Sequence, residues 1–310
     1  MIQYASGVIK IEFMKPSDIL FLRSNSNLLK LYYIEKYMKN INELLNFGVI
    51  NLDKPSGPTS FYVSNYVRKI LNLNKTSHMG TLDPQVSGVL PILLGRACRL
   101  SDYFMHKDKE YVGIMRLHRE TEPEELKKII SKFIGEIIQL PPVRSRVKRA
   151  ERVREVKSFE ILQIDGKDIL FKTEVQAGTY IRKLIHDIGE KIGGAHMLEL
   201  RRTCASIFKE SDSNFITLQE LEKAIEENYL ERYLVPAEEA IKKVLPFYQI
   251  SEKNLKKILT GKPLTKADFL KEVPKEKEEK FAAFAKEKFI GVYKKVNEGE
   301  IVARAEFVFN

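Results

Sequence analysis

The sequence contains few of the features that mark secreted, membrane or metal-dependent proteins. Its 310 residues include only two cysteines, Cys98 and Cys204, which lie far apart and form no CxxC pair. This usage is typical of a reduced cytoplasm and provides no metal site. No run reaches the roughly 18 to 20 uninterrupted apolar residues of a membrane helix, and the first residues lack a secretion-signal pattern. We therefore expect a cytoplasmic protein.

Common catalytic and nucleotide-binding motifs are also missing. The chain has no GxGxxG or GxxxxGK[ST] loop, no HExxH pair and no GxSxG turn. Its five histidines show no zinc-binding spacing, so we expect no metal ion. The absence of the two glycine-rich loops excludes the usual classes of nucleotide-binding protein.

The charge balance favours a polyanionic partner. Lys and Arg number 52 against 42 acidic residues, which gives a net charge of +10. Because many soluble proteins are basic without binding nucleic acid, charge alone makes such a partner plausible and no more. With 310 residues, 44% of them hydrophobic, the chain is long enough for a catalytic domain and a smaller one.

Local patterns predict strands and helices without regular alternation, which favours an α+β fold. Capping-box patterns at 121–124 and 217–220 predict two helix starts, and Thr179 is expected to cap a third helix. Thr59 or Ser60 can cap a fourth. We interpret the highly charged stretch 266–288 as a solvated loop or helix face. Strands are expected at 47–52, 110–117, 159–164, 169–175, 290–293 and 301–309.

Asp83 is the most unusual acidic residue in the sequence. It is the only formally charged residue between Thr76 and Gly95, although a 30% charged composition predicts about six in such a window. Because burying an unpaired charge is costly, this carboxylate either has a partner from elsewhere or is kept for chemistry. The alternative is a loop aspartate that caps a turn or helix, and composition alone favours it.

Arg182 occupies a second unusual position, in the first turn of the helix that follows Gly178 and Thr179. The positive end of the helix dipole disfavours a cation there. The placement suggests that Arg182 binds an anion, either a phosphate or a carboxylate such as Asp83, which an arginine can grip through two hydrogen bonds. The alternative is a solvent-exposed arginine with a dipole penalty of a few tenths of a kcal/mol.

A basic segment could follow an RNA backbone. Seven cations face two acids between residues 144 and 157. A solvated surface is the alternative. Tyr111 and Tyr180 could stack on a base, although most tyrosines in strands simply pack. His78 could contact phosphate or substrate, or make a structural hydrogen bond. The cations are Arg144, Arg146, Lys148, Arg149, Arg152, Arg154 and Lys157.

Five ordered motifs between about 48 and 202 resemble one family. The segment 78–84, His-Met-Gly-Thr-Leu-Asp-Pro, with Ser-Gly-Val-Leu-Pro at 87–91, resembles the catalytic-aspartate motif of the TruB-type pseudouridine synthases. Segments 48–55, 109–111, 178–182 and 194–202 are similar to the other motifs of that family. Met79 stands where relatives usually carry a small residue.

The short link between Tyr111 and Thr121, and the segment 184–186, resemble the archaeal and eukaryotic dyskerin branch, the catalytic subunit of box H/ACA ribonucleoproteins. The resemblance implies three parts. Residues 1–46 would be an extension that packs on the C-terminal domain. Residues 47–236 would be the catalytic domain, with a central mixed, mainly antiparallel sheet and flanking helices. Residues 237–310 would be a divergent, small β-barrel-like PUA domain that binds RNA.

The resemblance also implies a reaction without a cofactor, the isomerisation of uridine to pseudouridine. Asp83 would attack or deprotonate the ribose, Tyr111 would stack on the base, and Arg182 would pair with Asp83. We expect substrate contacts at His78, Tyr180, Leu200 and Lys54. We expect RNA-backbone contacts at Arg144, Arg146, Lys148 and Arg149 of the basic segment. The target would be ribosomal RNA, chosen by a box H/ACA guide RNA with small accessory proteins, or the T-loop uridine of tRNA. A ribonucleoprotein scaffold and an RNA-folding chaperone are the alternatives.

Overall fold

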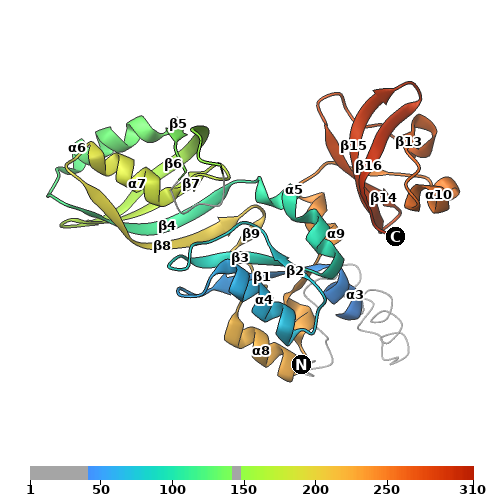
Figure 1. Ribbon diagram of the computed structural model, residues 1–310, viewed down its shortest axis with the longest axis horizontal. Helices are drawn as coiled ribbons and strands as arrows, with labels where there is room; N and C mark the ends of the chain where they lie inside the picture. Colours follow the sequence, from blue (N-terminus) through green and yellow to red (C-terminus); the bar gives the residue numbers. More distant parts are fainter. Residues whose placement is uncertain (1–40, 142–147) are drawn as a thin grey trace, which may run out of the picture.

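The computed structural model describes residues 41–141 and 148–310, which form two β-sheets of different size with helices around them (Figure 1). Eleven strands make the large sheet and five strands make the small one. The predicted α+β class is therefore confirmed. Most of the expected extension 1–46, and the expected RNA contacts Arg144 and Arg146, lie outside the described residues.

The large sheet is mixed and mainly antiparallel, as predicted. Its main path runs β10-β1-β3-β8-β4-β7-β6-β5, while β11 pairs with β1, β2 with β3 and β9 with β8. Two of these pairings, β1 with β10 and β3 with β8, are parallel. The strands are β1 (Gly48–Lys54), β2 (Thr76–His78), β3 (Ser87–Leu94), β4 (Lys109–Leu117), β5 (Gly135–Gln139), β6 (Arg152–Asp165), β7 (Asp168–Val175), β8 (Ala195–Ala205), β9 (Phe208–Lys209), β10 (Phe215–Thr217) and β11 (Leu234–Pro236).

The helices around this sheet bury one apolar face each. The largest hydrophobic cluster joins α4, α6, α7 and α8 to the strands. On α7 the apolar face consists of Ile181, Leu184, Ile185 and Ile188, which are at most 4% exposed. The helices are α3 (Ile41–Asn46), α4 (Ser60–Ile70), α5 (Ser101–Met105), α6 (Pro123–Ile130), α7 (Ile181–Glu190), α8 (Leu218–Glu226) and α9 (Ala237–Lys242), with short 3-10 helices η1 (Gly95–Leu100), η2 (Ser131–Phe133) and η3 (Leu230–Tyr233).

Two predicted helix caps are wrong. Glu122, not Thr121, precedes α6, because the proline that follows Glu122 keeps it out of the helical region. Tyr180, not Thr179, precedes α7, and the Thr179 hydroxyl donates instead to the Gln176 carbonyl at 2.8 Å. The predicted caps at Thr59 of α4 and Thr217 of α8 are confirmed, the latter as a full capping box.

The small sheet has the strand order β12-β14-β15-β16-β13. The interpretation of 266–288 as a solvated loop or helix face is wrong for its strand β14, because residues 281–285 are at most 3% exposed. The charges on either side of this Phe-Ala-Ala-Phe-Ala run conceal it in the composition. The elements are β12 (Phe247–Gln249), η4 (Glu252–Asn254), α10 (Leu255–Leu259), β13 (Leu264–Thr265), η5 (Lys266–Asp268), β14 (Lys280–Ala285), β15 (Lys288–Glu298) and β16 (Ile301–Val308).

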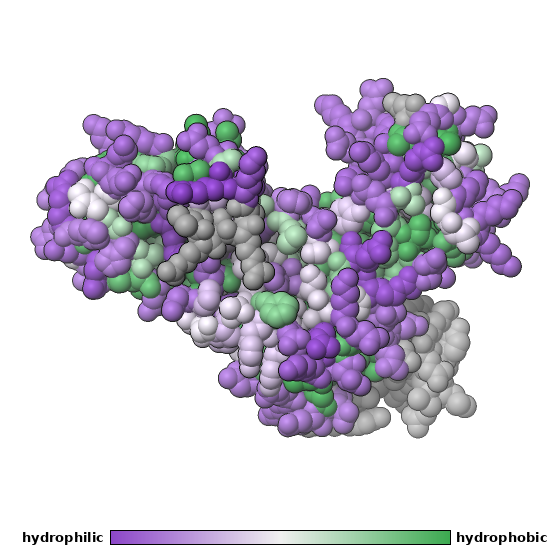
Figure 2. Space-filling view, viewed as in Figure 1, coloured by the Kyte–Doolittle hydropathy of each residue, from purple (hydrophilic) through white to green (hydrophobic). Residues whose placement is uncertain are grey.

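An apolar cluster packs the two sheets together. Phe47, just before β1, stacks on Phe289 of β15 with ring centroids 5.3 Å apart and lies 4.2 Å from the Phe309 ring. Ala237 and Ile241 of α9 belong to the same cluster. This cluster fixes the small sheet on the large one. The molecular surface seen in Figure 2 is mainly hydrophilic. Within residues 41–141 and 148–310, no helix has the length and apolar character needed to cross a membrane.

Candidate active site

Asp83 lies in the loop between β2 and β3, and the start of α4 holds that loop. The Ser60 hydroxyl accepts a hydrogen bond from the Leu82 amide at 2.8 Å and donates to the Leu82 carbonyl at 2.9 Å. The Val86 amide donates to the Asp83 carbonyl at 3.0 Å, which closes the turn. These bonds fix the backbone on both sides of the carboxylate.

The partner that Asp83 lacks in sequence comes from α7. Arg182 Nη2 lies 2.6 Å from Asp83 Oδ2, so the structure brings these two candidate residues together. Their side chains are 58% and 49% exposed, which leaves the carboxylate open to a ligand rather than buried. An arginine-carboxylate contact of this kind orients the carboxylate. The part that this contact plays in catalysis stays a prediction.

Gln139 positions the start of α7. It is 2% exposed at the end of β5, where its amide Nε2 donates to the Tyr180 carbonyl at 3.2 Å and its Oε1 accepts from the Tyr180 amide at 3.0 Å. The Tyr180 amide is thereby kept out of the helix, while its carbonyl also accepts a hydrogen bond from the Leu184 amide at 2.9 Å, and Arg182 falls at the second position of α7. No sequence pattern singles out this glutamine, because it ends an ordinary strand-like run.

Lys54, predicted to bind substrate, lies beneath the Asp83 loop. It is fully buried, and its ammonium donates to the carbonyls of Pro55, Pro84 and Val86 at 2.7, 3.0 and 2.8 Å. Burial, and then nearby Arg202, lowers the pKa of Lys54. This geometry makes Lys54 an anchor of the loop, and its contact with substrate stays a prediction.

Two more buried cations lie under the same loop. Arg202, 1% exposed, donates from Nε to the Val89 carbonyl at 2.8 Å and from Nη2 to the Gly80 carbonyl at 3.1 Å. Lys109, 6% exposed, donates to the carbonyls of Met105 and Lys107, and burial lowers its pKa to about 8. Both lie in motif segments identified from the sequence, 109–111 and 194–202, but received no role there, since burial of a cation leaves no mark on composition.

The remaining predicted contacts surround the loop at different depths. Tyr111 of β4 is 8% exposed and lies opposite Arg202 in the β4–β8 pairing. His78 is half-buried, and burial followed by Arg202 lowers its pKa, so its ring is neutral near pH 7. A neutral ring suits a hydrogen bond better than an ionic phosphate contact.

Leu200 is half-buried in β8 and lies opposite Gly113 of β4. A Cβ added at Gly113 would come within 3.0 Å of the Leu200 side chain. Met79 is buried in the cluster between the sheets.

Two exposed aromatic residues at the start of α4 extend the candidate site, and three cations lie before or on β6. Phe61 and Tyr62, next to Ser60 at the start of α4, are 75% and 60% exposed. Lys148 and Arg149 are exposed just before β6. Arg154 of β6 lies against Gly178, and its buried Nε has no hydrogen-bond partner in the described part of the chain. The sequence did not single out the two aromatic residues, because exposure cannot be inferred from a helical pattern alone.

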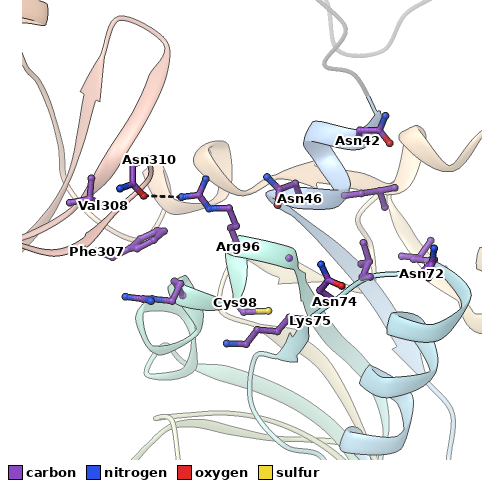
Figure 3. A pocket seen from close by; sticks show the side chains of 15 residues that line it. Asn42, Asn46, Asn72, Asn74, Lys75, Arg96, Cys98, Phe307, Val308 and Asn310 are labelled. Atoms are coloured by element: carbon purple, nitrogen blue, oxygen red, sulfur yellow. Dashed lines mark hydrogen bonds between the residues drawn. The ribbon is translucent and has the colours of Figure 1, made fainter. Parts of the chain in front are cut away.

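A separate cavity of about 840 Å³ lies at the junction of the two sheets, beyond the far end of β3 from Asp83 (Figure 3). Arg96, Arg99 and Lys75 line it together with Asn310, which accepts a hydrogen bond from Arg96 at 3.5 Å. It contains none of the predicted catalytic residues. Among the described residues, one cluster has metal-ligand types close together, His186, Asp187 and Glu190 on α7, but Lys183 already engages Asp187.

Comparison with protein families gives three matches along the chain. Residues 68–181 match the N-terminal domain of the TruB family of pseudouridylate synthases, and residues 182–242 match the C-terminal domain of tRNA pseudouridylate synthase B. Residues 18–64 match the DKCLD (NUC011) domain.

Among curated proteins, the chain is similar to proteins named probable tRNA pseudouridine synthase B. The one from Pyrococcus horikoshii is 44% identical over 83% of this chain and 80% of its own length. Those from Thermococcus onnurineus and Nanoarchaeum equitans are 52% and 46% identical over 64% and 69% of this chain. The chain spans only 61% and 63% of the length of these two relatives.

Two solved structures have a similar fold over 88% of this chain. One is a crystal structure of a Cbf5-Nop10-Gar1 complex, with a TM-score of 0.79 and 38% identity over 88% of the compared chain. The other is an H/ACA RNP bound to a substrate RNA containing 2′-deoxyuridine, with a TM-score of 0.78 and 36% identity over 88% of the compared chain.

Proposed function

Because the chain belongs to the TruB family of pseudouridine synthases, we propose that it isomerises uridine to pseudouridine in RNA, with Asp83 as the carboxylate that acts on the ribose. The observation that carries the proposal is the 2.6 Å contact between Arg182 and Asp83. It joins Arg182 of α7 to Asp83, which is distant in sequence and lies on a loop tied to Ser60 and Lys54. A surface-open carboxylate held from one side by an arginine can meet a sugar from the other.

The reaction begins when the target uridine leaves its stack, at an energetic cost of a few kcal/mol, and Tyr111 stacks on its base. Asp83 acts as a nucleophile at C1′ or as a base at C2′, and the bond from C1′ to N1 breaks. The uracil rotates and C5 bonds to C1′, which releases Asp83 from C1′ or is accompanied by return of the proton from Asp83 to C2′. The C5 proton then leaves and N1 gains one, with Tyr111 or water as the carrier, so substrate and product are isomers.

The residues around Asp83 hold the flipped nucleotide. Leu200 walls the pocket, while His78, Tyr180 and Lys54 contact or support the substrate. Lys148 and Arg149, with Arg144 and Arg146, follow the RNA backbone, and the exposure of the first two supports this assignment.

The C-terminal part anchors larger RNA. Residues 237–310 form a PUA-like RNA-binding domain, which the five-stranded sheet β12–β16 supports. The catalytic domain before it is 47–236. We expect the whole enzyme to act in the cytoplasm.

Two RNA substrates fit this enzyme. One is ribosomal RNA, selected by a box H/ACA guide RNA with small accessory proteins, and the similar H/ACA structures support it. The other is the T-loop uridine of tRNA, which the names of the similar proteins support. Incubation of the purified chain with a tRNA transcript separates them. Formation of pseudouridine in the tRNA transcript without guide RNA establishes the tRNA activity. Formation of pseudouridine only in ribosomal RNA, and only after addition of guide RNA and accessory proteins, establishes the guided activity. Absence of product in both would overturn the proposed function.

A further inference from the structure

The large sheet consists of two halves that a short strand pairing joins (Figure 1). The first half contains β10, β1 and β3 with β11 and β2, and the second contains β8, β4, β7, β6 and β5 with β9. In the described part of the chain, only β3 and β8 pair across this boundary, and they do so in parallel at two positions. The paired residues are Ser87 with Arg201 and Gly88 with Arg202. Because parallel pairing is slightly weaker per residue than antiparallel pairing, so short a contact constrains the angle between the halves only weakly.

The candidate active site spans the boundary between the two halves. Asp83 lies in the loop between β2 and β3 of the first half, whereas Arg182 of α7 and Tyr111 of β4 belong to the second half. The 2.6 Å contact between Arg182 and Asp83 therefore depends on how the two halves are set against each other. A misplacement of about 1 Å between reacting groups can lower a rate about a hundredfold.

Two buried cations hold the loop of Asp83, one from each half. Lys54 of β1 donates to carbonyls that follow Asp83, and Arg202 of β8 donates to carbonyls before and after it. Lys54, Gly88 and Arg202 lie side by side across β1, β3 and β8. Gly88 has φ +102°, and a Cβ there would lie 2.2 Å from the Arg202 carbonyl oxygen, so a glycine is required where the halves meet.

Arg201 joins the two halves on the other face of the sheet. Because neighbouring residues of a strand point to opposite faces, Asp53 and Arg201 lie on the face away from the two buried cations. The Arg201 guanidinium donates to both carboxylate oxygens of Asp53, from Nη1 to Oδ1 at 3.1 Å and from Nη2 to Oδ2 at 2.9 Å. Its Nη1 also lies 3.5 Å from the Ser87 hydroxyl. The two side chains are 36% and 19% exposed, and a two-bonded contact of this kind fixes the relative orientation of its partners.

We propose that Arg201 is a positioning residue for the isomerisation, an inference that rests on the proposed function. Its ion pair with Asp53 sets the angle between the two halves at which both buried cations hold the loop of Asp83. That angle places the carboxylate against Arg182 and against the ribose of a nucleotide bound by the second half. Arg201 thus acts through the sheet and not by contact with the substrate.

The test measures single-turnover conversion by Arg201→Gln, Asp53→Asn and the double variant. The substrate is the RNA that the wild type converts, either a tRNA transcript or a guided ribosomal RNA. Each single change removes the ion pair across the boundary, so we expect the rate constant at saturating enzyme to fall roughly ten- to a hundredfold. The affinity for the RNA should stay at the wild-type value. Since both changes remove the same contact, the double variant should be no slower than the slower single variant.

Glu210→Gln is the matched control. Glu210, between β9 and β10, accepts a hydrogen bond from Arg201 Nε at 2.8 Å. Its replacement removes the other ion pair of Arg201 and leaves the pair with Asp53 in place, so we expect the wild-type rate constant. A loss as large as that in Asp53→Asn would overturn the proposal, because the charge around Arg201 and not the contact across the boundary would then set the rate.

Loss of folded protein gives a different result from loss of position. Partial unfolding raises the enzyme concentration needed for saturation but leaves the rate constant at saturation unchanged. A wild-type rate constant in Asp53→Asn would therefore overturn the proposal, and so would losses in the two single variants that add in the double variant.

Asp53→Asn replaces one carboxylate oxygen by an amide nitrogen of similar size, so it decides the question even if Arg201→Gln fails to fold. The proposed function is tested separately, because it fails only if the wild-type protein forms no pseudouridine.

Discussion

Gln139 binds both backbone hydrogen-bonding groups of Tyr180, with distances of 3.2 Å from Nε2 to the carbonyl and 3.0 Å from the amide to Oε1. The pair joins the edge strand β5 to the first turn of α7, two residues before Arg182. The direction in which Arg182 leaves its helix is therefore set from a strand that carries no catalytic candidate.

Replacing this glutamine should weaken the site from a distance. Gln139→Leu leaves the Tyr180 amide without its partner, while the carbonyl keeps the bond from the Leu184 amide. We therefore expect a loss of about 1 to 3 kcal/mol in the free energy of unfolding. The rate of pseudouridine formation should fall further than stability alone explains, since Arg182 loses its orientation. Urea unfolding and single-turnover kinetics measure the two effects, and Gln163→Leu on the exposed part of β6 is the control. An unchanged rate in Gln139→Leu would show that Tyr180 needs no such support.

Lys109 should make stability rise with pH. Burial lowers its pKa in the folded protein to about 8, against 10.5 for the ordinary side chain. Between these two values the unfolded chain binds more protons than the folded one, so raising the pH favours folding. Relative to Lys109→Met, the wild type should gain up to about 3 kcal/mol between pH 8 and 10.5. Chemical unfolding at several pH values measures this difference, and parallel curves for the two proteins would refute it.

Phe61 should contribute to RNA binding and not to folding. Its ring is 75% exposed beside the Asp83 loop, and stacking of an aromatic ring on a base is worth about 1 to 3 kcal/mol. Phe61→Ala should therefore raise the dissociation constant for substrate RNA roughly 5- to 150-fold, with the melting temperature unchanged. Leu162→Ala, 45% exposed on β6, is the matched control and should bind normally. Equal affinities of the two variants would remove Phe61 from the RNA interface.

The exposed cations Lys148 and Arg149 should act by charge. If each neutralises one phosphate, Lys148→Gln and Arg149→Gln should each reduce the slope of log affinity against log salt by about 1. The loss should be similar for every RNA sequence, because phosphate contacts carry no sequence information. Lys128→Gln, an exposed lysine of α6, should leave the slope unchanged. A slope that stays at the wild-type value in the first two variants would contradict the assignment.

The two residues of the central ion pair could be selected from sequence because each breaks a local rule. Asp83 is alone in a window that should hold several charges, and Arg182 stands at the wrong end of a helix dipole. Their contact could not be derived, since it depends on how α7 packs beside the β2–β3 loop. Lys54, Lys109 and Arg202 show the opposite case, because nothing in a lysine or arginine reveals that the fold will bury it.

The fold shows the same division. The strand and helix periods predicted most elements, including β1, β4, β7 and α8 with its capping box. The predicted caps at Thr121 and Thr179 failed because a proline and a distant glutamine, respectively, determine where α6 and α7 begin. Strand β14 was missed because five small and aromatic residues are flanked by lysines and glutamates. Tertiary contacts decided each of these positions.

The most direct test of the proposed function is pseudouridine formation under single-turnover conditions by the wild type and by Asp83→Asn. Asparagine has nearly the same shape but can neither attack nor deprotonate the ribose as a carboxylate does. We predict normal RNA affinity and a rate at least about a thousandfold lower for the variant, on whichever RNA the wild type converts. Conversion by Asp83→Asn at the wild-type rate would contradict the assignment of Asp83 as the catalytic carboxylate.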